Sequence, residues 1–162
     1  MVRVKLPLKI KLNYLLIPLF VIITASAASH FADTGLAWYK TINLPGWTFS
    51  SMFMLNIWII IFVFTSISIL IIWNRYSKER NFSLIMGLFV FNAVLNVGWS
   101  ILFYTQQQLG LALFESILLV FNISLLIGLI WRFCPLAACM LLPYTVWVIF
   151  TTVLTLNVLI IN

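Results

Sequence analysis

The chain has 162 residues, of which 64% are hydrophobic and only 7% are charged. About a quarter of the residues in a soluble domain are charged, so this composition excludes an ordinary soluble domain and predicts that lipid surrounds most of the chain. The nine Lys and Arg residues outnumber three Asp and Glu. Because the basic residues lie at the ends of hydrophobic runs, we expect them to set membrane topology and not to bind nucleic acid.

The first predicted element is a membrane-spanning helix over about residues 12–31. Basic residues precede it and the small residues 25–29 follow its apolar run, a layout that also resembles a secretory signal peptide. The apolar run is long for a signal peptide, so we expect a retained helix whose small residues let another helix or a ligand approach closely. His30, the only histidine, lies at its end near Asp33. We interpret His30 as a solvated end residue, with a haem ligand or a pH-sensitive cap as alternatives.

Residues 32–50 form the longest polar connection, and Pro45 followed by glycine is a turn signal within it. The segment carries too many aromatic residues for an idle surface loop. These are Trp38, Tyr39, Trp47 and Phe49. We therefore expect this loop to fold back as a cap over the membrane end of the helices.

Four further spans are predicted over about residues 51–73, 82–104, 109–131 and 135–160. Pro143 lies inside the last of these and should bend it, because proline removes one backbone donor. No stretch remains for a soluble domain. The predicted fold is therefore an all-α integral membrane protein, a bundle of five transmembrane helices with a structured first extramembrane loop, in one domain over residues 1–162.

The positive charges also predict an orientation. With a cytoplasmic N-terminus, eight of the nine basic residues fall on the cytoplasmic side and only Lys40 falls outside. Such an excess is typical of cytoplasmic loops, and five spans then place the C-terminus outside. We expect an integral protein of a bacterial cell membrane.

Three predicted spans carry stripes of mixed aromatic and polar side chains, at spacings that share one helical face. The stripes comprise Trp58, Phe62 and Thr65; Asn92, Asn96 and Trp99, extended by Phe103; and Tyr144, Trp147, Thr151 and Thr155. One interpretation is helix packing with asparagine hydrogen bonds between helices. The other, which we favour, is a shared cavity, because tryptophan is too large for close helix packing.

Glu115 is the one acidic residue inside a predicted span, and Ser116 follows it. Such a carboxylate is either a proton site or ligand contact, or a group that snorkels or stays neutral near the interface, and both interpretations stay open. Cys134 and Cys139 lack the spacing of a metal site. We expect no metal site and no catalytic residues, because no Ser/His/Asp set, phosphate loop, carboxylate pair or CxxC motif is present.

Three segments resemble one family in their order and spacing. They are residues 38–47 with Trp38-Tyr39 and Pro45-Gly46-Trp47, residues 91–103 (FNAVLNVGWSILF), and residues 142–150 (LPYTVWVIF). Together they are similar to the tryptophan-rich sensory protein / translocator protein family (TspO/MBR, peripheral benzodiazepine receptor), over about residues 25–162.

The resemblance implies a five-helix bundle, commonly a homodimer, with a pocket for porphyrins under the first loop. Porphyrin would be a ligand, and no covalently bound cofactor is expected. The cap would include Tyr39, Pro45 and Trp47, and the cavity Trp58, Phe62, Asn96, Trp99, Trp147 and Thr151. The expected ligand-binding set is completed by Asn92, Ser116 and Tyr144.

The sequence also departs from the family pattern. Phe49-Ser50 stand where prolines are common, Leu154-Thr155 replace a Leu-Asn pair, and Thr151 replaces a small alanine. These changes are expected to narrow the pocket or alter its polarity. A basic tail that animal relatives use for cholesterol is missing, so we do not predict cholesterol as the ligand.

Three functions are compatible with these features. The first is a membrane receptor or sensor for porphyrins, with a role in tetrapyrrole transport or stress regulation. The second is a proton-coupled transporter of another small hydrophobic solute, based on Glu115 and Asn122. The third is a light-dependent enzyme that degrades porphyrin through nearby tryptophans. We favour the first because it uses the predicted aromatic cavity.

Overall fold

The computed structural model describes residues 12–162, which form helices and no strands. The elements are α1 (Asn13–Thr34), α2 (Leu36–Tyr39), α3 (Ser51–Arg75), α4 (Phe82–Ser100), η1 (Ile101–Thr105), α5 (Leu109–Trp131), α6 (Pro135–Cys139) and α7 (Leu142–Ile161). The π-helical η1 continues α4, and α6 leads into α7, which gives five helices long and apolar enough to cross a membrane. The predicted fold class is therefore confirmed. The four basic residues before Leu12 lie outside the described residues.

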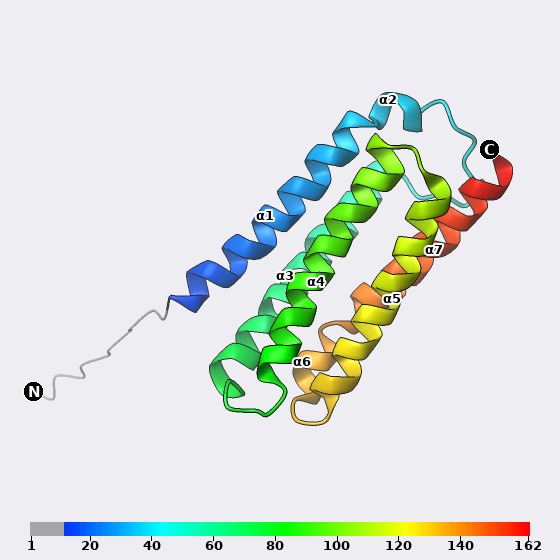
Figure 1. The fold of residues 1–162 in the computed structure, drawn as a ribbon. Helices are drawn as coiled ribbons and strands as arrows, with labels where there is room; N and C mark the ends of the chain where they lie inside the picture. Colours follow the sequence, from blue (N-terminus) through cyan, green and yellow to red (C-terminus); the bar gives the residue numbers. More distant parts are fainter. Residues whose placement is uncertain (1–11) are drawn as a thin grey trace, which may run out of the picture.

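The five spans form one bundle, in which α4 packs between α1 and α5, and α5 packs against α7. Helix α1 also packs against α3, whereas α3 and α7 touch only lightly. The short α2 and the C-terminus lie at one end of the bundle, and α6 lies at the other (Figure 1). These are called the α2 end and the α6 end below.

Large apolar side chains cover the outside of every span. Examples are Ile22 on α1, Ile60 on α3, Val94 on α4, Phe121 on α5 and Val146 on α7, all of them exposed. A helix that is apolar both inward and outward suits a lipid surrounding. The outward faces therefore agree with the composition in making lipid the main solvent.

The bundle is filled with aliphatic side chains near the α6 end. This aliphatic core consists of Ile69, Ile72, Ile85, Ile123, Leu126, Ile130, Ala137, Ala138 and Leu141. Ser68 on α3 donates a hydrogen bond of 2.9 Å to the carbonyl of Ala137 on α6. The short α6 thereby closes this end of the bundle against α3 and α5.

The last span differs from the predicted single bent helix. The span is divided into two helices: α6 ends at Cys139, α7 begins at Leu142, and Pro143 lies in the first turn of α7. Proline costs little there, because first-turn N–H groups have no partner within the helix. The prediction of a bend is therefore wrong, because the proline begins a new helix.

The first connection is also more helical than predicted. Helix α1 continues to Thr34, and residues 36–39 form α2, so the irregular part begins at Lys40. Gly35 joins the two helices, and its N–H bonds to the carbonyl of Ala32 at 3.2 Å. The short α2 therefore starts directly where the first span ends.

Candidate ligand-binding cavity

A cavity of about 730 Å³ lies among the spans toward the α2 end. All five spans contribute to its lining, together with α2. Ligand pockets in proteins are typically about 300–1,000 Å³. The cavity is therefore far larger than a packing defect and has the size of a ligand site.

Aromatic faces from α3 and α4 form much of the wall. Trp58 stacks on Phe62 with ring centroids 5.7 Å apart, and Trp99 stacks on Phe103 at 4.8 Å and 18°. All four side chains line the cavity. Most of the spacing-based stripes on these two spans therefore face the cavity, although Thr65 and Asn92 do not line it. Phe103 extends the stripe of α4 into η1, as expected.

The π-helical η1 brings two successive side chains, Phe103 and Tyr104, to the cavity. Two neighbouring residues on an ordinary helix diverge by about 100°, whereas a π-bulge widens the turn, and such bulges are frequent at functional sites. Tyr39 from α2 contacts both rings, at 6.2 and 5.5 Å. Burial raises the pKa of the Tyr39 phenol, which keeps it a neutral hydrogen-bond donor. No sequence signal marked the π-bulge, so Tyr104 was missed.

Helix α1 approaches η1 so closely that only glycine fits at position 35. A Cβ on Gly35 would lie 2.6 Å from the carbonyl carbon of Tyr104 and 2.7 Å from its Cβ. The Thr34 and Thr105 hydroxyls share a hydrogen bond of 2.8 Å across the same contact. This contact fixes α1 against η1 beside the cavity.

Small residues on α1 form another part of the lining, among them Ala25, Ala28 and Ser29. They belong to the run that was expected to allow close approach of a helix or a ligand, but they were not included among the predicted binding residues. Their short side chains leave room on the α1 side of the cavity. The run of small residues is the sequence signal that finds them.

The α5 and α7 wall carries hydroxyl groups that are already bonded within their own helices. Thr151 donates to the carbonyl of Val148 at 3.0 Å, and Thr155 donates to the carbonyl of Thr151 at 2.8 Å. Ser116 donates to the carbonyl of Leu113 at 2.8 Å. All three donors line the cavity, yet this wall offers few free polar groups.

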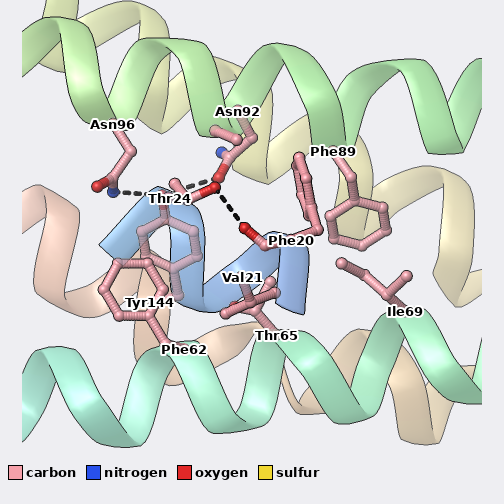
Figure 2. A pocket seen from close by; sticks show the side chains of 11 residues that line it. Phe20, Val21, Thr24, Phe62, Thr65, Ile69, Phe89, Asn92, Asn96 and Tyr144 are labelled. Carbon is pink, nitrogen blue, oxygen red and sulfur yellow. Dashed lines mark hydrogen bonds between the residues drawn. The ribbon is translucent and has the colours of Figure 1, made fainter. Parts of the chain in front are cut away.

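A buried polar network lies beside the cavity and joins α4, α5 and α7. Asn92 donates to Asn122 at 2.8 Å, Tyr144 donates to Asn92 at 2.9 Å, and Asn96 donates to Tyr144 at 3.1 Å. Figure 2 shows the two α4 asparagines turned toward Tyr144. Asn92 and Tyr144 therefore serve helix packing and do not face the large cavity, because they form hydrogen bonds between helices.

The same network borders a second, much smaller cavity of about 20 Å³, between α1, α3 and α4 (Figure 2). That is room for a single water molecule. Thr65, which lines it from α3, has a buried hydroxyl with no hydrogen-bond partner among residues 12–162. Asn96 lines both cavities and so connects the network to the larger one.

Five of the predicted binding residues do not line the large cavity. Asn92 and Tyr144 belong to the network, and Trp147 is buried, stacked on Phe150 at 5.0 Å. Trp47 lies edge-on to that phenylalanine at 5.5 Å. Pro45 begins a turn in which its carbonyl accepts from Thr48 at 3.0 Å. Of the three predicted cap residues, only Tyr39 reaches the cavity.

The loop after α2 is instead tied to α7. The backbone N–H of Asn43 donates to the Asn162 side chain at 2.8 Å, and that side chain donates back to the Asn43 carbonyl at 3.0 Å. Phe49 packs on Phe150 at 5.2 Å. The loop therefore packs along α7 from Phe150 to its C-terminal end.

Three titratable side chains lie in different places relative to the cavity. Glu115 is buried, its two oxygens have no hydrogen-bond partner among residues 12–162, and it is not among the cavity-lining residues. His30 and Asp33 do line the cavity, from the end of α1, where both are exposed. The single histidine thus lies at the cavity opening.

Comparison with known proteins identifies the family of this chain. The sequence model of the TspO/MBR family matches residues 14–161. The chain belongs to the TspO/MBR family. The resemblance seen in the three aromatic segments is thereby confirmed.

Relatives within the TspO/MBR family come from bacteria and animals. The tryptophan-rich protein TspO of Bacillus cereus is 31% identical over 126 residues, which cover 77% of this chain and 80% of the relative. The uncharacterized membrane protein YtaB of Bacillus subtilis is 30% identical over 133 residues, 82% and 85% of the two chains. The translocator protein of Ovis aries is 31% identical over 124 residues, 74% and 72% of the two chains.

Proposed function

We propose that this TspO/MBR family member is a membrane receptor that binds porphyrins or related flat, hydrophobic ligands in the cavity at the α2 end. The observation that carries the proposal is the size of the cavity, about 730 Å³, together with its aromatic walls. A flat conjugated ring gains from offset stacking and edge contacts with indole and phenyl rings. Trp58, Trp99 and Phe103 offer such rings from two sides.

Polar groups that could orient a ligand lie among the apolar and aromatic lining, as in other ligand sites. The indole N–H of Trp99 is buried and has no acceptor among residues 12–162. Buried polar groups are nearly always satisfied in native proteins. The Trp99 N–H is not exposed at the cavity surface, whereas the neutral phenol of Tyr39 is a donor at the lining itself.

The proposal is tested by titrating the purified protein with protoporphyrin IX and following the quenching of tryptophan fluorescence. Thr151→Phe adds bulk to the cavity wall, so we expect it to weaken binding at least tenfold. Val153→Phe is the matched control, because Val153 is on the same helix but exposed on its outside. It should leave the affinity within about twofold.

A second pair of variants separates specific binding from partitioning into detergent. Trp58→Leu removes a cavity ring, whereas Trp73→Leu removes an exposed ring at the end of α3. Loss of affinity in the first and not in the second supports the site. Equal affinities in the wild type, Thr151→Phe and Trp58→Leu would overturn the proposal.

We also propose that the α6 end faces the cytoplasm of a bacterial cell and the α2 end faces outward. Among residues 12–162, four of the five basic side chains lie at the α6 end, where Arg75 ends α3 and the other three follow α3 or α5, and Lys40 alone follows α2. Cytoplasmic loops carry such an excess. A cysteine at exposed Lys40 should react with a membrane-impermeant maleimide in intact cells, whereas one at Lys78 should not.

A further inference from the structure

We propose that Asp33 makes the cavity select ligands by the charge of their polar edge, favouring neutral or cationic groups over free carboxylates. This inference rests on the proposed function, because it concerns ligands of the same cavity. Asp33 would discriminate among ligands that share one ring system but differ in the charge of their substituents. The cavity would then have two parts, an aromatic part that binds the ring and a charged opening that contacts the substituents.

The charged side chains of the cavity lining support this proposal. The lining lies wholly within residues 12–162, and it contains one carboxylate, Asp33, and no lysine or arginine. Its formal charge with His30 neutral is therefore −1. A ligand with carboxylate groups finds no lysine or arginine in this lining to pair with.

The position of Asp33 is the second support. Ser26, His30 and Asp33 are four and three residues apart on α1, so they share one helical face. All three are exposed and all three line the cavity, which places them at its opening. The aromatic rings belong to α2, α3, α4 and η1. A ligand that stacks on the rings therefore turns its polar edge toward this face of α1 or toward the open side.

The end of α1 adds to the negative potential there. Asp33 lies in the last turn, which holds no basic residue. The C-terminal end of a helix carries a partial negative charge from its aligned peptide dipoles. Neutral and cationic groups are favoured at such a position, and a carboxylate is repelled by both the side chain and the helix end.

Lys40 is the basic residue that could oppose this effect. It follows α2, is exposed, and does not belong to the lining. A fully hydrated charge is largely screened within about 10 Å at ordinary ionic strength. Asp33 is exposed as well, but it belongs to the lining and acts on a bound ligand at shorter range, so we expect it to dominate over Lys40.

The test uses three forms of one porphyrin ring on the purified full chain at constant pH and ionic strength. They are protoporphyrin IX with its two carboxylates, its dimethyl ester, and its bis-amide with ethylenediamine, which is cationic. Each is titrated by tryptophan quenching into the wild type and into Asp33→Asn, which keeps the size of the side chain. Comparing the two proteins for each ligand cancels the different partitioning of the ligands into detergent.

We expect Asp33→Asn to tighten binding of the free acid about tenfold, to weaken binding of the cationic amide by a similar factor, and to change the ester less than twofold. Glu79→Gln is the matched control, because it removes one negative charge from the connection between α3 and α4. It should leave all three affinities unchanged.

The outcomes separate the inference from the function it rests on. If the ligands bind but Asp33→Asn shifts the three affinities equally or not at all, charge selection by Asp33 is wrong and the receptor proposal stands. If Lys40→Gln weakens binding of the free acid by a larger factor than Asp33→Asn tightens it, Lys40 pairs with the carboxylates and the inference is overturned. If none of the three ligands quenches tryptophan, the proposed function itself fails.

Discussion

The two ends of the bundle are built from the same spans but are filled in different ways. At the α6 end, branched aliphatic and small side chains such as Ile72, Ile85 and Ala137 are completely buried. At the α2 end, large rings such as Trp58 and Trp99 hold each other and leave a cavity of about 730 Å³. Branched and small side chains interdigitate at close range, whereas flat rings contact one another and keep backbones apart. The comparison shows that side-chain shape, more than hydrophobicity, decides where such a bundle is hollow.

The backbone differs between the two ends as well. At the α6 end the last span is interrupted before Pro143, and the short α6 packs against α3 and α5. The α2 end has a π-helical turn and a contact at Gly35 that admits no side chain. Between them, the bonds from Asn96 through Tyr144 and Asn92 to Asn122 tie three spans together. We expect the filled half to supply stability and the hollow half to supply binding.

The sharpest test of this comparison is to truncate one leucine in each half. Leu126→Ala should lower the free energy of unfolding by about 2–5 kcal/mol, because it opens a new cavity in the aliphatic core. Leu154→Ala should cost only about 1–2 kcal/mol, because this side chain already borders the large cavity. Denaturant or thermal unfolding in detergent measures both. Equal costs would mean that the hollow half is as tightly packed as the filled one.

A smaller loss is expected from Gly35→Ala, at the contact that holds α1 against η1. The added methyl group would meet the Tyr104 backbone, and such overpacking costs about 1–3 kcal/mol. Porphyrin affinity should fall with it, because Tyr104 lines the cavity. Gly46→Ala is the control, since no atom lies within 4 Å of its added Cβ. A stable Gly35→Ala variant with unchanged affinity would contradict the role of this contact.

The smallest effect should be a gain in stability from Glu115→Met. Both carboxylate oxygens are buried without a partner in the part of the chain that the structure describes. Burying an unpaired polar group costs about 1–3 kcal/mol in protein mutants, so methionine should raise the melting temperature by a few degrees. Glu79→Met, at an exposed position, serves as the control. A marked loss of stability in Glu115→Met would indicate that the carboxylate has a partner in the membrane.

The sequence predicted the stripes on α3 and α4 well because each lies on one regular helix. Trp58, Phe62, Asn96 and Trp99 share their faces by helical spacing, and all four line the cavity. The same reasoning was weaker for α7, where Tyr144 and Trp147 are turned into the core and Thr151 lines the cavity. Helical spacing tells which residues share a face, but it does not tell which neighbour that face meets.

The sequence by itself determined the membrane class, the five spans and the family, because apolar length and composition are properties of each segment alone. Only the tertiary structure decided that Tyr104 reaches the cavity through a π-bulge and that the loop after α2 is tied to Phe150 and Asn162. It also decided that Asp33 lies at the opening of a lining without lysine or arginine. These features depend on contacts between residues far apart in the chain, which no local pattern encodes.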